Sequence, residues 1–521
     1  MAKNGQEALS LCGNKKIDIV LTDYDMPVMN GLDMIQVIRK NNKKIPIIFV
    51  TGIEDSDVII EALHLQVTNF LKKPIDVESL LEVMDNTVKI IIADQTIEKE
   101  NTFKLQQLQE RDAYNTYQED LGFLKELSIL RNDFYYQRIG MEYNCLIDFI
   151  YMPLDTLSGD AYSARKLGDN HYFYLIVDGM GKGISASFTS ILITAFINYK
   201  IDKMIVGKHG FDLGYLIEEA AKYIKPILLD EEMFAISFIE IDMIASTLNY
   251  ALFSMPPLLI QKYNGSVEKI ISNNPPLSEY SEKFEINSYN VNDVTKYLFY
   301  SDGLNESEIN EGKGIYSECI QDDFRASLTR EDFKNKILEK IHVQEDDITC
   351  IFINRLDCKN NLLFEKEINS SMANVEKAQE WYEEIFETFT TDEVLLSKAT
   401  LTFTEMILNA HEHGNMGIDS LKKHKMISDG SYWDVLEVLE LERCLLKKIK
   451  ISIYKVIYHD NQEYIVTNIK DDGAGFDTQI LTKIFRNREQ FNGKGVFISR
   501  KSSYGIYYNN IGNDVTFIHK L

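Results

Sequence analysis

Acidic residues next to short apolar runs are the side chains of this sequence with the clearest chemical potential. Asp178 follows the run Tyr172–Val177, which is too short for a typical helix and rich in aromatic and branched residues, so a buried strand is expected there. Gly179, Gly181 and Gly183 come next and let the backbone crowd in beside the carboxylate, an arrangement that suits a hard metal ion. A single Asp-Gly pair, however, is more often a plain corner between a strand and a helix.

Three further segments place carboxylates at the boundaries of expected strands. Asp160 follows a Ser-Gly turn, Asp302 follows the apolar run Tyr297–Tyr300, and Asp346 and Asp347 precede the run Ile348–Ile353. Each segment alone is typical of a solvated turn. Four such segments, two of them with Asp-Gly after an apolar strand, are hard to explain as turns. We therefore expect these carboxylates to meet in one metal site.

The composition narrows the class of protein and its partners. The chain has 521 residues, which is too long for one core and suggests about three domains. Its formal net charge of −25 argues against nucleic acid or an anionic membrane as a partner. Six cysteines without a CxxC pair are typical of reduced thiols in a cytoplasmic protein. No apolar run is expected to span a bilayer, and residues 1–15 lack the core of a signal peptide.

Residues 1–90 alternate helical and strand patterns, which is the rhythm of a doubly wound parallel sheet with helices on both faces. Asp23, Thr51 and Lys73 lie at the carboxyl ends of the expected strands. In sheets of this kind the active residues lie at those ends, so these three side chains are the candidates for chemistry in this part of the chain.

The segments LTDYDMPVMNGLDMI, FVTG and FLKKPI resemble, in this order, the receiver domain of response regulators. The resemblance implies Asp23 as phosphoacceptor, Thr51 as switch hydroxyl, Lys73 as the lysine that contacts the phosphoryl group, and an upstream histidine kinase. The sequence does not supply the family's first strand, first helix or the acidic pair that holds Mg²⁺. Two interpretations stay open: a wrongly placed start codon, or an incomplete domain that is a structural remnant.

Residues 91–135 contain no proline and are rich in Glu, Gln, Lys and Leu. Five residues fall at alternating three- and four-residue steps, the seam spacing of a coiled coil: Tyr114, Tyr117, Leu121, Leu124 and Ser128. We expect a helical linker that makes the chain a homodimer. The alternative is one amphipathic helix packed on its own domain.

Residues 136–357 contain SGD, VDGMGKG, SDGLNE and DDIT in order, and this set resembles the PP2C-like phosphatases of the SpoIIE/RsbU type. The resemblance implies a β-sandwich with flanking helices that dephosphorylates serine or threonine with two Mn²⁺ or Mg²⁺ ions. It also implies a site in which the catalytic Asp178 bridges the metals and the Gly179 carbonyl, Asp160, the catalytic Asp302 and Asp346 complete the ligands, with Asp347 able to substitute or orient. The family's Ala-Gly-His-Pro segment is replaced here by Phe253–Pro256.

The chemistry of such a site follows from charge. Two divalent ions between carboxylates lower the pKa of a bridging water and neutralise phosphate oxygens. Ligands that are all oxygen select Mg²⁺ or Mn²⁺ over zinc. The attacking group is then water, and no residue needs to act as a nucleophile.

Residues 358–521 contain three elements that suit a nucleotide. Glu405 and Asn409 are four residues apart and share one helix face. A strand ends at Asp471 before two glycines, and FNGKGVF places two more before a helix, where backbone N–H groups can meet phosphates. His411 and His413, two residues apart, do not face one direction, so zinc is not expected there.

In this order the three elements resemble the GHKL (Bergerat) ATP-binding α/β sandwich, close to the anti-sigma serine kinases of the RsbW type. The resemblance implies ATP with Mg²⁺ held by Asn409, Glu405 as base and Asp471 on the adenine amino group. The backbone around Gly473, Gly475, Gly493 and Gly495 would surround the nucleotide, under a lid that carries Lys483, Arg486 and Arg488. Residues 416–449 form a longer insertion than the family leads one to expect, and no phosphoacceptor-histidine helix is present.

The expected fold class is therefore a multidomain α/β and α+β protein, divided at 1–90, 91–135, 136–357 and 358–521. This combination resembles bifunctional regulators of partner switching, in which kinase and phosphatase act on a STAS-domain anti-sigma antagonist under control of the receiver. Two alternatives remain. The C-terminal domain could sequester a sigma or anti-sigma factor with little kinase activity, or a constitutive phosphatase could use an incomplete receiver only as a dimerisation platform.

Overall fold

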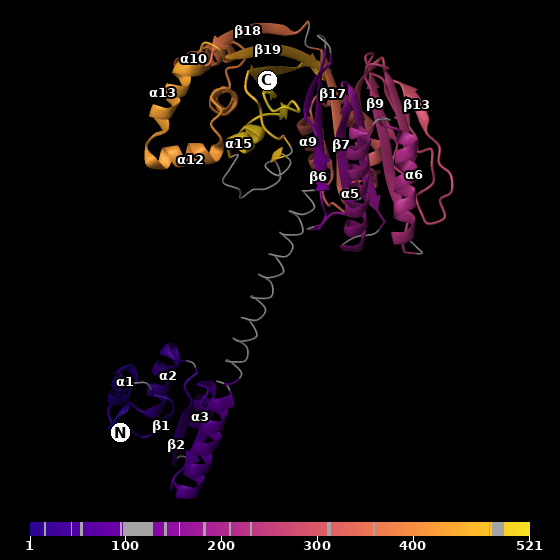
Figure 1. Ribbon diagram of the computed structural model, residues 1–521. Coiled ribbons are helices and arrows are strands. Elements are labelled where there is room, and N and C mark those ends of the chain that lie inside the picture. The colour runs from indigo at the N-terminus through magenta and orange to yellow at the C-terminus, as the bar shows by residue number, and fades with distance from the viewer. Residues whose placement is uncertain are drawn as a thin grey trace. The chain divides into compact units, whose positions relative to one another are not determined.

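The computed structural model divides into two compact units, Met1–Tyr117 and Gln118–Leu521 (Figure 1). The structure describes residues 1–14, 17–42, 44–52, 56–93, 96, 129–139, 143–155, 157–180, 184–207, 210–229, 232–309, 314–357, 360–478, 480–481 and 494–521. The expected coiled-coil seam lies outside these residues. So do Gly181, Gly183, Gly493 and the lid residues Lys483, Arg486 and Arg488.

The first unit is a three-stranded parallel sheet in the order β1-β2-β3, with strands at Val20–Asp23, Ile47–Thr51 and Asn69–Lys72. Its helices are α1 (Gly5–Asn14), α2 (Gly31–Asn41), α3 (Ser56–His64) and a helical stretch at 77–93. Successive residues of the buried β2 join different cores: Ile47 and Phe49 pack with α2 and α3, and Ile48 and Val50 pack toward 77–93. Helices therefore cover both faces, as the sequence predicts.

The second unit begins with two six-stranded sheets. The first has the order β13-β10-β9-β8-β7-β4, with strands at Asn287–Asn290, Thr247–Phe253, Phe234–Asp242, His171–Gly179, Asp160–Gly168 and Arg131–Asn132. The second has the order β12-β11-β14-β17-β6-β5, with strands at Val267–Ile270, Leu258–Lys262, Val294–Tyr300, Ile348–Asp357, Tyr143–Met152 and Tyr136–Ile139. A short hairpin pairs β15 (Glu308–Ile309) with β16 (Gly314–Ile315).

The two large sheets pack face to face and form a sandwich. Phe149 of β6 stacks on Tyr162 of β7 with ring centroids 4.6 Å apart, and Tyr174 of β8 lies 5.6 Å from Phe299 of β14. Helices α5 (Ile184–Val206) and α6 (Leu213–Ile224) cover the first sheet. Shorter helices at the second sheet are α7 (Asp302–Glu306), α8 (Ile320–Ala326) and α9 (Arg330–Lys340). Short 3-10 turns lie at Lys225–Ile227 and Tyr316–Glu318. This is the expected sandwich with flanking helices.

One expectation about the membrane needs correction. By length and composition, α5 is the one helix among the described residues that is apolar enough to cross a bilayer, whereas the sequence was expected to contain no such run. Half of that apolar window is buried inside the structure, where Ile193, Ile197 and Ile201 pack into the core beneath the first sheet.

The remainder of the second unit is a five-stranded sheet in the order β18-β19-β20-β22-β21, with strands at Leu362–Asn369, Lys448–Tyr458, Gln462–Asp471, Asp514–Lys520 and Gly505–Tyr508. It packs with α10 (Met372–Glu387), α11 (Glu393–Asn409) and α15 (Lys494–Ser502). A π-helical turn at Ala410–Asn415 extends α11, and a 3-10 turn lies at His459–Asn461. The insertion forms α12 (Ser420–Asp429) and α13 (Tyr432–Arg443).

The sandwich and this C-terminal layer share one hydrophobic core, which includes Ile351 of β17 as well as Phe403 of α11. Polar contacts also cross the junction. The Tyr135 N–H donates to the Tyr508 carbonyl at 3.1 Å, and the Tyr464 hydroxyl donates to Asp332 of α9 at 3.1 Å. The second unit is therefore a single packed body.

Candidate metal centre

The strand pattern brings the predicted acidic residues to one end of the sandwich. β7 begins at Asp160 and β8 ends at Asp178–Gly179, and the antiparallel register pairs Asp160 directly with Asp178. On the second sheet, Asp302 follows β14 while Asp347 precedes β17. The Ser301 N–H donates to the Thr349 carbonyl at 2.9 Å, which holds these two strand ends together.

The carboxylates of Asp160, Asp178 and Asp302 are close enough to act on one another. Burial, and then the negative charges of Asp160 and Asp302, raise the pKa of Asp178 well above its ordinary value. Burial is also the main reason that the pKa of Asp160 is raised, although the Ser301 hydroxyl donates to this carboxylate at 2.6 Å and opposes the shift. Within the described residues, no Lys, Arg or His forms an ion pair with any of the three.

These residues can be tested for their fit to a divalent cation. Among the described residues, no group of three or more His, Cys, Asp or Glu side chains is arranged as a ready set of metal ligands. The Oδ2 atom of Asp178, however, is buried without a hydrogen-bond partner. A buried carboxylate oxygen with no donor, beside two further carboxylates, lacks the positive charge that a hard cation supplies. The chemistry of these carboxylate donors therefore fits Mg²⁺ or Mn²⁺.

Asp160, Asp178 and Asp302 together form an acidic corner at this end of the sandwich, and Gly179 allows helix α5 to approach it. A Cβ atom at this position would lie 2.9 Å from the Ser190 hydroxyl oxygen, 3.1 Å from the Ala186 carbonyl oxygen and 3.1 Å from the Phe234 ring. The Ser190 hydroxyl donates to the Gly159 carbonyl at 2.5 Å, which ties the helix to the turn before Asp160. A glycine is needed here because the helix lies against the backbone.

Asp347 has a different environment from the other carboxylates. Its Oδ1 accepts the Leu154 N–H and its Oδ2 accepts the Gly159 N–H, both at 2.6 Å. Both oxygens are thus used to hold the loop that leads into Asp160, which favours an orienting role over direct ligation. Asp346 is half-buried, and its Cβ lies 3.2 Å from where a Cβ of Gly303 would be, next to Asp302.

Ser301 and Ser190 are parts of this site that the sequence interpretation did not include. Ser301 stands directly before Asp302 in YSDG, so its position next to a predicted ligand was a usable signal. Ser190 carries no local signal, because only the packing of α5 brings it to the Gly159 carbonyl.

In the first unit, Asp23 and Lys73 form an ion pair, and Thr51 is buried at the end of the neighbouring strand. All three lie at carboxyl ends of the parallel strands, where the sequence places them. The Cβ atom of a residue at Gly31 would lie 2.2 Å from the Asp23 carbonyl oxygen, so the start of α2 also packs against this residue.

The predicted nucleotide residues of the C-terminal layer come from two places in the fold. Glu405 of α11 lies directly under α15, because a Cβ at Gly495 would be 2.1 Å from its Oε2 atom. Gly495 is inside the first turn of α15, not before it as the sequence suggests. Asn409, half-buried, closes the same helix as Glu405.

Asp471 is the last residue of β20 and is buried. Its Oδ1 accepts the Gly473 N–H at 2.7 Å and would lie 2.4 Å from a Cβ at Gly414. Burial raises the pKa of Asp471 to about 7. Gly475 has φ +74 and sits against the Ile511 carbonyl, a conformation and a contact that suit only glycine.

The two histidines after Asn409 bind different partners. Nδ1 of the buried His411 lies 2.9 Å from the Ser370 hydroxyl, and its Nε2 lies 2.9 Å from Oε1 of Glu440. His413 contacts the carbonyl of Ile418. These contacts hold the insertion against the sheet.

Comparison with known proteins identifies two segments. Residues 1–85 match the response regulator receiver domain, and residues 168–356 match the model of stage II sporulation protein E (SpoIIE). The phosphoserine phosphatase RsbP of Bacillus subtilis is 25% identical over 167 residues, which cover 30% of this chain and 39% of that relative. The probable transcriptional regulator ycf29 of Porphyra purpurea is 30% identical over 105 residues, covering 20% of this chain and 50% of the relative. The chain thus spans half or less of each.

Two solved structures are similar over larger parts. The RsbU and RsbW domains of a Mycobacterium tuberculosis protein share 15% identity at a TM-score of 0.38, covering 72% of this chain and 94% of that one. The PP2C phosphatase domain of SpoIIE from Bacillus subtilis, with a fragment of its regulatory domain, shares 19% identity at a TM-score of 0.35, covering 42% and 64%. From the family matches, the chain carries a receiver domain followed by a SpoIIE-type domain.

Proposed function

We propose that the sandwich is a metal-dependent phosphoserine phosphatase whose activity is set by the receiver and opposed by an ATP-dependent serine kinase of the GHKL, RsbW type at the C-terminus. The proposed substrate of both is a STAS-domain anti-sigma antagonist. The observation that carries the phosphatase is the convergence of Asp160, Asp178 and Asp302 at one end of a sandwich that matches SpoIIE.

The side chains at the acidic corner have two proposed roles: some hold the metal ions, and others orient the ligands. Asp178, Asp160 and Asp302, with the Gly179 carbonyl and Asp346, would hold the metal. When bound, two divalent ions supply a water of lowered pKa and neutralise the phosphate oxygens. The Ser301 hydroxyl occupies one oxygen of Asp160 and so orients the other. Asp347 fixes the loop that precedes Asp160.

Replacing Asp178 with Asn tests this proposal. The expected result is loss of phosphate release from a phosphorylated STAS protein and loss of the thermal stabilisation that Mn²⁺ gives the wild type, which is about 2.7 kcal/mol at a hundredfold excess over the dissociation constant. Without metal the variant is expected to unfold at a higher temperature than the wild type, because an amide replaces a buried carboxyl group whose ionisation beside Asp160 and Asp302 is unfavourable.

Asp155→Asn is the matched control, since Asp155 is an exposed residue of the loop between β6 and β7. It is expected to keep both activity and the Mn²⁺ effect. Normal phosphate release by the Asp178 variant would contradict the metal assignment.

The kinase part of the proposal rests on two contacts with glycine-containing segments. Glu405 lies beside Gly495, and Asp471 accepts the N–H of Gly473. Radiolabelled ATP with the dephosphorylated STAS protein is expected to label serine in the wild type. Glu405→Gln should reduce this transfer by about a hundredfold or more, the usual size of a general-base effect. Glu393→Gln, an exposed change at the start of the same helix, should not. Absence of transfer by the wild type, with retained binding of a sigma or anti-sigma factor, would instead favour a binding module.

The ion pair of Lys73 with Asp23, beside the buried Thr51, supports phosphorylation of Asp23 by an upstream histidine kinase as the input. In the proposed arrangement the chain is a homodimer, and the receiver signal reaches the sandwich through residues 91–135.

A further inference from the structure

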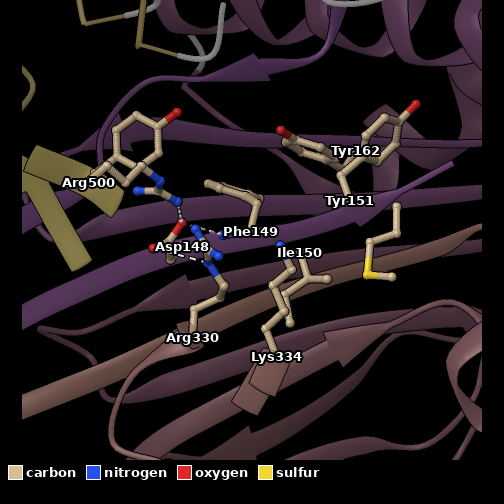
Figure 2. A pocket seen from close by; sticks show the side chains of 10 residues that line it. Asp148, Phe149, Ile150, Tyr151, Tyr162, Arg330, Lys334 and Arg500 are labelled. Atoms are coloured by element: carbon tan, nitrogen blue, oxygen red, sulfur yellow. Dashed lines mark hydrogen bonds and ion pairs between the residues drawn. The ribbon is translucent and has the colours of Figure 1, made fainter. Parts of the chain in front are cut away.

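A cavity of about 110 Å³ lies where the sandwich meets helix α15. Figure 2 shows Asp148 of β6 between Arg500 and Arg330, with Lys334 beside Arg330 and the rings of Tyr151 and Tyr162 on the far side. The cavity belongs to neither the acidic corner nor the nucleotide residues described above, and its volume is below the ~300–1,000 Å³ typical of pockets for drug-sized molecules.

The lining carries more positive than negative charge. Arg500 donates to Oδ1 of Asp148 at 2.7 Å, and Nε of Arg330 lies 3.5 Å from its Oδ2. The one carboxylate is therefore shared between two guanidinium groups. Arg330 also pairs with Glu331, but Lys334 forms no ion pair within the described part of the chain. Counting Glu331, three cations face two carboxylates.

The position of Lys334 adds to the excess of positive charge in the cavity. It stands four residues after Arg330 on α9, so both side chains extend from one face of the helix into the same cavity. Burial, followed by the charge of Arg330, lowers the pKa of Lys334, while Arg330 and Arg500 hold the pKa of Asp148 below its ordinary value against the effect of burial. Within the described residues the cluster thus contains one lysine that lines the cavity and has no ion-pair partner of its own.

We propose that this cavity binds one small oxyanion with the chemistry of phosphate, held between Arg500 of the C-terminal layer and Arg330 and Lys334 of the sandwich. Guanidinium groups bind phosphate oxygens through directed, charge-assisted hydrogen bonds, and Lys334 adds a point charge. The volume accommodates an ion of this size together with water. The bound ion would join the two layers, because its ligands come from both.

The cavity is also connected to the acidic corner. Tyr151 lines the cavity, and its hydroxyl donates a hydrogen bond to the Asp160 carbonyl at 3.3 Å. Asp148 and Tyr151 are on the same strand, β6, and the loop that follows this strand is the one held by Asp347. The wall of the cavity opposite the cationic groups therefore contacts the backbone of a predicted metal ligand through Tyr151. Free phosphate, the product of the proposed phosphatase, has the required chemistry.

Calorimetric titration of the full chain with inorganic phosphate, in the presence of EDTA, tests this proposal. EDTA keeps phosphate from binding through metal ions at the acidic corner, so the outcome does not depend on the proposed phosphatase. The expected result is one phosphate bound per chain. Lys334→Gln should weaken binding by roughly tenfold, the value of one lost charge-assisted hydrogen bond, and Arg500→Gln by at least as much.

The decisive variant is Lys334→Gln, because this change breaks no ion pair of the described structure and should leave folding intact. Lys336→Gln on the same helix makes the same charge change at a residue that does not line the cavity, and it should bind phosphate as the wild type does. Titration with phosphoserine separates the two sources of the anion: weaker binding than phosphate supports the free ion, and tighter binding supports a phosphoryl group carried by a protein. No saturable binding by the wild type, or equal affinity in the Lys334 and Lys336 variants, would overturn the proposal.

Discussion

Among single residues, Asp347 and Asp178 have the same side chain and opposite surroundings. Both oxygens of Asp347 accept backbone N–H groups, so its charge is satisfied by the fold. Asp178 keeps a buried oxygen without a donor, beside two other carboxylates. The free-energy cost of burying such a group without a partner is several times the net free energy of one hydrogen bond. A cation bound at Asp178 would remove this cost and so stabilise the fold.

Asp471 provides a test of the C-terminal site through pH. Its folded pKa of about 7 is above the ~3.9 of an unfolded aspartate, so the folded state binds the proton more tightly and stability falls as pH rises from about 4 to about 7. Asp471→Asn keeps the oxygen that accepts the Gly473 N–H but cannot ionise. Its stability gain over the wild type should therefore grow by about 2 kcal/mol between pH 5.5 and pH 8.5.

Urea unfolding at the two pH values measures this difference, with fluorescence as the signal because the only two tryptophans, Trp381 and Trp433, are in the C-terminal layer. A gain that is the same at both pH values would show that Asp471 does not titrate in this range.

Sequence patterns single out the candidate metal ligands because each stands at the boundary of an expected strand. The same patterns do not predict that Asp148, Arg330 and Arg500 lie together. Asp148 lies inside β6 and Arg500 is 352 residues later, in the last turn of a helix, so only the docking of two layers makes them neighbours. Local periodicity carries no information about such a contact.

At the scale of elements, the acidic corner depends on how closely α5 approaches the end of β8. Gly179→Ala would bring a methyl group to 2.9 Å from the Ser190 hydroxyl and 3.1 Å from the Ala186 carbonyl, and the helix backbone cannot yield as a flexible side chain would. We expect a loss of about 1–3 kcal/mol in stability, the usual cost of overpacking, and at least a tenfold loss of Mn²⁺-dependent activity.

Gly168→Ala is the matched control for that prediction. It lies at the other end of β7, where the nearest atom to an added Cβ is 3.9 Å away. Thermal unfolding and phosphate release should be close to those of the wild type. If Gly179→Ala behaved like Gly168→Ala, close packing of α5 would not be what positions the Gly179 carbonyl.

Most elements follow from the sequence where the pattern is strong. The expected strands before Asp23, Asp178 and Asp471 are confirmed: β1 ends at Asp23, β8 at Gly179 and β20 at Asp471, each after a run rich in apolar residues. The expected position of Gly495 before a helix is wrong, since Gly495 lies inside the first turn of α15. A glycine usually weakens a helix, but here it makes room for Glu405, and that requirement comes from tertiary packing.

At the scale of the whole molecule, the sequence suggests four segments, whereas the structure packs the sandwich and the C-terminal layer into one body. Their common core and the contact of Tyr464 with Asp332 are made by residues far apart in the chain. Motifs mark where a domain begins, but they do not show whether its surface is apolar enough to fuse with the next one.

A shared core predicts shared unfolding. Ile351→Ala removes a fully buried side chain from the sandwich and should cost about 2–5 kcal/mol. Because both tryptophans are in the C-terminal layer, their fluorescence reports that layer alone. We expect the guanidinium midpoint of this fluorescence to fall together with the midpoint of the far-ultraviolet circular dichroism of the second unit. Ile38→Ala, in the core of the separate first unit, should leave the fluorescence midpoint unchanged. If Ile351→Ala also left it unchanged, the two layers would unfold independently, and an anion at their junction would bridge two domains that are only docked.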